Sequence, residues 1–175
     1  MRNRFTTTTL LLALGSVCGT TRIAGASDVR TDIVTTASST ASPDREAIRA
    51  ALALLPRQPV RVAVMDVTQN RPPVRDYLLT LDAFTVAGND VVYVVQQSDV
   101  LKGARSGSAL YRAMLATILW HEMAHVEGAD ERRARKAEED LWKRFVRDGV
   151  TDQMTALRYL DLLTKRPDDM LLASR

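Results

Sequence analysis

The first regular hydrophobic pattern in the chain has helical spacing and follows a capping signal. Ser42 and Pro43 form an N-cap with proline at the first helical position. Apolar residues then recur three and four positions apart until Pro56, at Ala47, Ile48, Ala51, Leu52 and Leu55. This pattern predicts a helix over about 43–55.

Three β-rich runs follow this helix. Residues 60–65 alternate between valine and other residues, which is the period of a strand, and the proline-containing segment 69–73 ends the run. Residues 81–86 and 91–96 form two more runs, and the turn-like segment 87–90 between them predicts a hairpin. The run at 91–95 is the most apolar, which is typical of a core strand. The alternative is a strand bordering a cleft, along which an extended peptide could pair.

Two further helices are predicted around a glycine. Residues 103–108 form a small polar break, and the pattern is helical from 109 to 127. From Met114 onward this helix is apolar nearly all round, which is typical of a helix buried on most sides. Gly128 is placed to end it, and Asp130 to cap a second helix that runs to about residue 148.

The inner face of the second helix is marked by apolar residues, with two glutamates projecting near it. The apolar residues are Ala134, Leu141, Trp142 and Phe145, and the glutamates are Glu131 and Glu138. A last helix is expected at about 152–164, with Met154, Leu157, Leu160 and Leu163 facing inward. The elements together predict one α+β domain over 42–175, with a small mixed sheet of about three strands.

The N-terminal segment indicates export. Arg2 and Arg4 precede the short apolar stretch 10–17, and small residues at 24–26 offer a cleavage site, so residues 1–26 are interpreted as a signal peptide. The apolar stretch is too short to span a membrane. Lipidation of Cys18 is the alternative, although the residues before it fit a lipid-attachment signal poorly. The expected location is periplasmic or extracellular, in a bacterium, and residues 27–41 are expected to be a disordered leader.

Removal of the signal changes the charge of the chain. The whole sequence carries 24 basic and 21 acidic residues, but three arginines belong to the signal, so the mature chain has no net charge. Nucleic-acid binding therefore has no electrostatic support. The sole cysteine also lies in the signal, so the mature protein can form no disulfide.

The candidate chemistry lies in the apolar helix. His121 and His125 are the only histidines of the chain, and at a separation of four residues they share one helix face. Together with Glu122 they form the His-Glu-x-x-His arrangement of zinc hydrolases, in which the ion lowers the pKa of a water molecule and the glutamate takes its proton. The alternative is a chance match with two buried, hydrogen-bonded histidines. The burial of the helix argues for Zn²⁺, since its three polar side chains need partners.

Residues 118–146 resemble the active-site region of the zincin metallopeptidases. Metzincins continue with a glycine and a third histidine, and Gly128 stands at the glycine position, but Glu131 stands at the histidine position. Gluzincins use a glutamate from the following helix in the pattern Glu-x-x-Ala, which Glu131 and Ala134 match. Arg135 replaces the acid or amide that usually comes next. The outer hydrogen-bond partner of a histidine is therefore open between Asp130 and Glu138.

The resemblance implies a compact gluzincin-like zinc metallopeptidase acting on peptides or proteins, with Glu122 as general base and acid. His121, His125 and Glu131 would hold Zn²⁺. Glu138 is the alternative third ligand, but it lies about 10 Å further along its helix, and a solvated position is the simpler interpretation for it. The oxyanion-stabilising candidates are Tyr159, Arg158 and Tyr93. The alternative function is a zinc-binding envelope or binding module with little or no peptidase activity.

Overall fold

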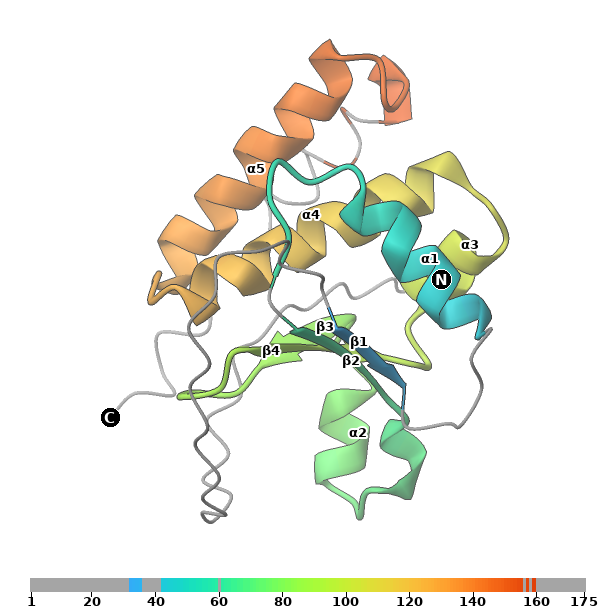
Figure 1. Cartoon of the computed structure of the whole chain (residues 1–175), viewed down its shortest axis with the longest axis vertical. Coiled ribbons are helices and arrows are strands. Elements are labelled where there is room, and N and C mark those ends of the chain that lie inside the picture. The colour runs from blue at the N-terminus through green and yellow to red at the C-terminus, as the bar shows by residue number, and fades with distance from the viewer. Residues whose placement is uncertain (1–31, 36–41, 60, 156, 158, 160–175) are drawn as a thin grey trace.

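The computed structural model describes residues 32–35, 42–59, 61–155, 157 and 159 (Figure 1). Strands and helices alternate in the first half of this region, and helices fill the second half. The elements are β1 (Asp32–Thr35), α1 (Pro43–Leu52), β2 (Arg61–Met65), a 3₁₀ helix (Val67–Gln69), α2 (Val74–Leu78), β3 (Ala83–Thr85), β4 (Val91–Val95), α3 (Asp99–Arg105), α4 (Ala109–Val126) and α5 (Glu131–Arg147).

The strands form a mixed sheet in the order β1-β2-β4-β3, in which only β3 is antiparallel to its neighbour. Helices α1, α3 and α4 cover one face, α5 packs outside α4, and α2 lies under the other face (Figure 1). Alternate residues of the strands divide between the two faces. Val62, Val64, Val92 and Val94 join the main core under α4, whereas Phe84 and Val95 join the smaller cluster on the α2 side.

The three predicted strands are confirmed as β2, β3 and β4, and the predicted hairpin joins β3 to β4. Gly88 has a φ of 79° in its turn, a conformation that glycine adopts without steric conflict. The prediction of a disordered leader over 27–41 was wrong for residues 32–35, which form β1; the remainder of that stretch lies outside the described residues. β1 pairs with β2 along its length, and a pairing with a strand so distant in sequence leaves no local compositional signal.

The cleft-bordering interpretation of residues 91–95 was also wrong. β4 lies inside the sheet between β2 and β3, so both of its edges are already paired. The edge strand of the described sheet on this side is β3. A peptide that extends the sheet there would therefore pair with β3.

Helix α1 begins as predicted, with the Ser42 side chain accepting a hydrogen bond from the Asp44 amide, but it ends at Leu52. α3 replaces the predicted polar break at residues 103–105. Ser98 caps it by accepting from the amides of Val100 and Leu101. Gly103 is needed inside this helix because a Cβ there would lie 2.2 Å from Cγ of Tyr111 on α4.

Helices α4 and α5 confirm the predictions for the second half of the chain. Gly128 ends α4 with a φ of 87°, and the Asp130 side chain caps α5 by accepting from the Arg133 amide at 2.8 Å. The predicted inner face of α5 is buried: Ala134, Leu141, Trp142 and Phe145. Within the described residues, no helix is both long and apolar enough to cross a membrane.

The prediction that Met154 and Leu157 of the C-terminal helix face inward was wrong. Residues 153–155, 157 and 159 are helical, but Met154 is 67% exposed and Leu157 is 52% exposed. Tyr159 is buried instead, with its ring centroid 4.3 Å from that of Trp142. Leu160, Leu163 and the predicted signal peptide lie outside the described residues.

Candidate metal centre

The two histidines lie in the last two turns of α4 and face the same space. Nε2 of His121 is 3.0 Å from Nε2 of His125, because residues four apart on a helix lie one above the other. His121 is fully buried, and the His125 side chain is 7% exposed. α4 therefore presents two ring nitrogens together, almost out of contact with water.

Nδ1 of each histidine faces a hydrogen-bond acceptor, which indicates that the ring proton is on Nδ1. Nδ1 of His125 lies 3.0 Å from the Ala129 carbonyl oxygen, which can only accept, so Nδ1 carries the proton. Nδ1 of His121 lies 3.1 Å from Oε2 of Glu138 and donates to it in the same way. In the neutral rings, both Nε2 atoms then hold lone pairs directed at the shared space.

Glu131 completes a set of three donor atoms. Its Oε2 lies 3.2 Å from Nε2 of His125 and 3.6 Å from Nε2 of His121. Zn²⁺ bonds of about 2.0–2.2 Å in a tetrahedron require ligand atoms about 3.3–3.6 Å apart. The three observed separations, 3.0, 3.2 and 3.6 Å, are close to this range, so the residues fit the ion.

The electrostatics of the three residues also favour a positive charge between them. Burial disfavours the charged form of His121, but the carboxylates of Glu131 and Glu138 outweigh burial and raise the pKa of His121 to about 9. Burial opposes ionisation of Glu131, but the neighbouring His121 and His125 rings outweigh it and hold the pKa of Glu131 well below the ordinary range. Without an ion, a proton on His121 supplies this charge.

Glu138 lies on the other side of the His121 ring from the three donor atoms. It is fully buried, so the expectation of a solvated position was wrong. Its Oε2 faces Nδ1 of His121, and its Oε1 accepts a hydrogen bond from the Tyr159 hydroxyl at 2.8 Å. Glu138 is therefore the outer partner of His121 rather than a third ligand. Asp130, the other candidate for that role, caps α5.

Glu122 is fully buried, and neither carboxylate oxygen has a hydrogen-bond partner among the described residues. Burial raises its pKa to about 7, and the charges of His121 and His125 act in the opposite direction. The Thr85 hydroxyl of β3 also favours the ionised form, without reaching hydrogen-bond geometry. A buried carboxylate without a hydrogen bond is costly, so Glu122, which has none among the described residues, is suited to a partner such as water or a ligand.

A pocket of about 350 Å³ opens beside His125. The β3–β4 hairpin contributes one wall with residues 85–90, and His125, Val126 and Ala129 at the end of α4 contribute the other. The edge strand and the histidine helix therefore border an open pocket at His125, which contributes one of the three donor atoms.

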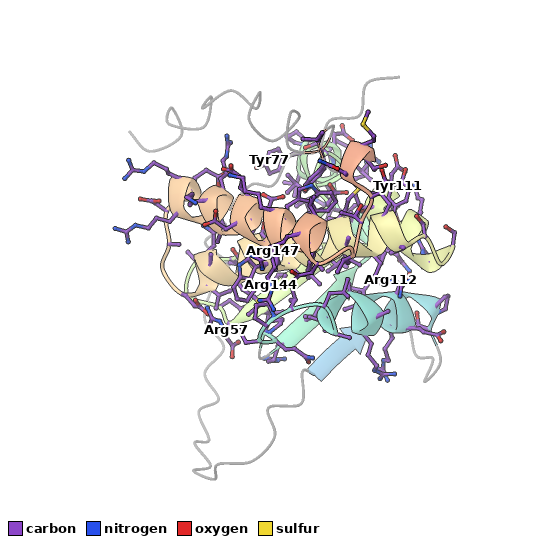
Figure 2. The ribbon with its side chains drawn as sticks, turned by 90° about the horizontal axis from the view of Figure 1, so that it is seen from above. Arg57, Tyr77, Tyr111, Arg112, Arg144 and Arg147 are labelled. Atoms are coloured by element: carbon purple, nitrogen blue, oxygen red, sulfur yellow. The ribbon has the colours of Figure 1, made fainter. Side chains whose placement is uncertain are left out.

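The Arg57 side chain contacts two residues near the C-terminal end of α4, close to this pocket. Arg57, which follows α1 and is labelled in Figure 2, forms an ion pair with Glu127. The Arg57 guanidinium also lies 5.2 Å from the ring centroid of Trp120. The Glu127 side chain is thus used in a surface contact outside the group of donor atoms.

Neither of the two oxyanion candidates that the structure describes is among the residues that line the pocket. The Tyr159 hydroxyl donates to Glu138, and the Tyr93 ring stacks on Phe84 on the α2 side of the sheet. Arg158 lies outside the described residues. The contact between Arg135 and Glu131 was not predicted, although residues four apart on a helix lie close enough to form an ion pair.

The chain matches no protein-family model, no curated protein and no solved structure.

Proposed function

We propose that this chain is an exported zinc metallopeptidase that hydrolyses peptide bonds. The observation that carries the proposal is the group formed by His121, His125 and Glu131, whose donor atoms all lie within 4.8 Å of one another beside the buried Glu122. These three residues would hold the ion. Zn²⁺ would supply a Lewis acid that lowers the pKa of water and polarises a peptide carbonyl.

The role of Glu122 in this proposal is proton transfer. Its carboxylate has no competing hydrogen bond among the described residues, and its pKa of about 7 suits a group that accepts and returns a proton near neutral pH. It would take a proton from the attacking water and deliver it to the leaving amine. His125 and His121 keep their orientation through the Ala129 carbonyl and Glu138.

The substrate proposed for the site is an extended peptide. β3 is the edge strand of the described sheet next to α4, and its backbone could pair with such a peptide. The pocket between the hairpin and α4 would then hold one substrate side chain. Both contacts would bring the peptide close to His125, one of the three proposed metal ligands.

Two measurements test the proposal. Metal analysis of the mature protein should give about one Zn²⁺ per chain, and His125→Ala should abolish binding. Glu122→Gln should keep the Zn²⁺ and lose peptide cleavage, since the amide cannot accept the proton. Glu46→Gln, an exposed glutamate on α1, is the matched control and should retain both. A wild-type protein that binds no metal would rule the proposal out.

The second candidate is a zinc-binding module with little or no peptidase activity. It is favoured by the positions of Tyr159 and Tyr93, because the Tyr159 hydroxyl donates to Glu138 and neither tyrosine is among the described residues that line the pocket. Screening the zinc-loaded protein against a broad peptide library distinguishes the two. Cleavage that disappears in Glu122→Gln supports the peptidase, and zinc binding without cleavage supports the module.

Export is part of the proposal and has its own test. The expected signal peptide would be removed after Ala26, whereas lipidation would retain Cys18 with an attached lipid. The mass of the mature protein, isolated from the periplasm of an expressing bacterium, separates these two outcomes. A precursor of full mass in the cytoplasm would contradict both.

A further inference from the structure

Arg135 lies on α5 one turn after Glu131 and contacts its carboxylate. Nε of Arg135 donates to Oε1 of Glu131 at 2.8 Å, whereas Oε2 faces the ring nitrogens of the two histidines. The two oxygens of one carboxylate thus have separate partners. The side chains of Arg135 and Glu131 are 22% and 32% exposed, so the contact is partly shielded from water.

We propose that Arg135 is a positioning residue for the metal: it fixes the Glu131 carboxylate so that a single oxygen is offered to the ion. The inference rests on the proposed metal site and adds a determinant of its affinity and coordination. Arg135 would not bind the ion itself, since its guanidinium is a cation. It acts only through Glu131.

Without Arg135, the Glu131 carboxylate would be free to turn. A glutamate in the first turn of a helix can rotate its terminal carboxylate, and a bound cation attracts both oxygens. A guanidinium that holds Oε1 removes this freedom, because its N–H groups lie in a fixed plane. Partners of this kind orient metal ligands, and their loss commonly weakens metal binding about 10- to 100-fold.

The positive charge of Arg135 acts in the opposite direction, since it repels the metal ion. The guanidinium is partly exposed, however, and water reduces this repulsion. We therefore expect the loss of orientation to outweigh the loss of repulsion. The competing explanation is an ordinary helical ion pair between residues four apart, which stabilises a helix slightly and has no effect on a metal.

Zn²⁺ affinity, measured by competition with a chromophoric chelator, tests the proposal. Arg135→Met keeps the apolar stem and helix propensity, and should weaken binding about 10- to 100-fold. Arg135→Lys keeps the charge without the planar group and should recover only part of the loss. Arg133→Met, at an exposed position two residues away, is the matched control and should bind as wild type. Circular dichroism of the metal-free variants should show the same helical content.

Co²⁺ absorption provides a readout of coordination that does not depend on activity. A four-coordinate Co²⁺ absorbs more strongly in the visible range than a five-coordinate one. Release of the second Glu131 oxygen in Arg135→Met should therefore weaken the bands relative to wild type. The Arg133→Met spectrum should match wild type.

The results separate this inference from the proposed function. Zn²⁺ affinity of Arg135→Met within twofold of wild type, or tighter, overturns the positioning role and leaves the peptidase proposal intact. Complete recovery by Arg135→Lys also overturns it, because charge alone would then suffice. A wild-type protein that binds no Zn²⁺ overturns both.

Discussion

Glu122→Gln should change the stability of the metal-free protein in a pH-dependent manner. Burial raises the pKa of the Glu122 carboxyl from 4.5 to about 7. For an acid whose pKa is higher in the folded state, the neutral form is favoured in the native protein. The contribution of the protonated Glu122 carboxyl to the stability of wild type is therefore fully present below pH 4.5 and is lost as the pH rises through 7. Glutamine is neutral throughout, so the variant gains on wild type as the pH increases.

The size of the effect follows from the two pKa values. Each pH unit between them corresponds to about 1.36 kcal/mol, so the full difference is about 3 kcal/mol. Between pH 5 and pH 8.5, the range that is convenient for unfolding, about 2.5 kcal/mol of it should be visible. The desolvation of the buried amide is present at both pH values and cancels from the comparison.

Urea unfolding of both proteins in the presence of a chelator, at pH 5 and pH 8.5, measures this difference. Glu46→Gln on the exposed side of α1 is the control, and its effect should stay within about 0.5 kcal/mol at either pH. Zn²⁺ should narrow the gap at pH 8.5, since a nearby cation stabilises the ionised carboxylate of wild type. An unfolding difference that is the same at both pH values would show that burial does not outweigh the histidine charges at Glu122 and does not raise its pKa.

Three further substitutions test the surroundings of the site. Tyr159→Phe removes the hydroxyl that donates to the buried Glu138, and should lower the free energy of unfolding by about 1–3 kcal/mol and weaken Zn²⁺ binding; unchanged urea midpoints would contradict this. Ala87→Trp, at an exposed position on the pocket wall, should lower kcat/KM at least about tenfold by filling the pocket, with Zn²⁺ stoichiometry unchanged; full activity would place substrate elsewhere. Gly103→Ala should destabilise the protein by about 1–3 kcal/mol in thermal or urea unfolding, since its Cβ meets the Tyr111 ring; wild-type stability would show that the ring can move away.

The hydrophobic periodicity was sufficient to predict the helices that build the site. α4 and α5 follow the pattern closely because their buried faces are long and their ends carry clear signals. Gly128 follows the C-terminus of α4, and Asp130 caps the N-terminus of α5. The prediction of α4 also implies that the two histidines lie on one face, since residues four apart share a face in any α-helix. The local spacing of α4 and its following turn was thus enough to place most of the donor atoms.

The errors came from contacts made between distant parts of the chain. β1 forms because β2 pairs with it, and its sequence alone resembles a polar leader. Glu138 looked solvent-exposed by residue type, but it is buried because Tyr159 and His121 both donate to its carboxylate. The inward orientation of Met154 and Leu157 was mispredicted, since Tyr159 packs against Trp142 and these two more apolar residues remain exposed.

The spacing of the two α5 glutamates explains how one helix completes the environment of His121. Glu131 and Glu138 are seven residues apart, so they project from one side of α5 at points about 10 Å apart along its axis. α5 packs against α4, and the first carboxylate therefore meets Nε2 of His121 while the second meets Nδ1. Glu138 holds the His121 ring in place, and Glu131 adds the negative charge that favours a bound cation. Both functions disappear together if α5 shifts along α4, which ties the metal centre to the packing of these two helices.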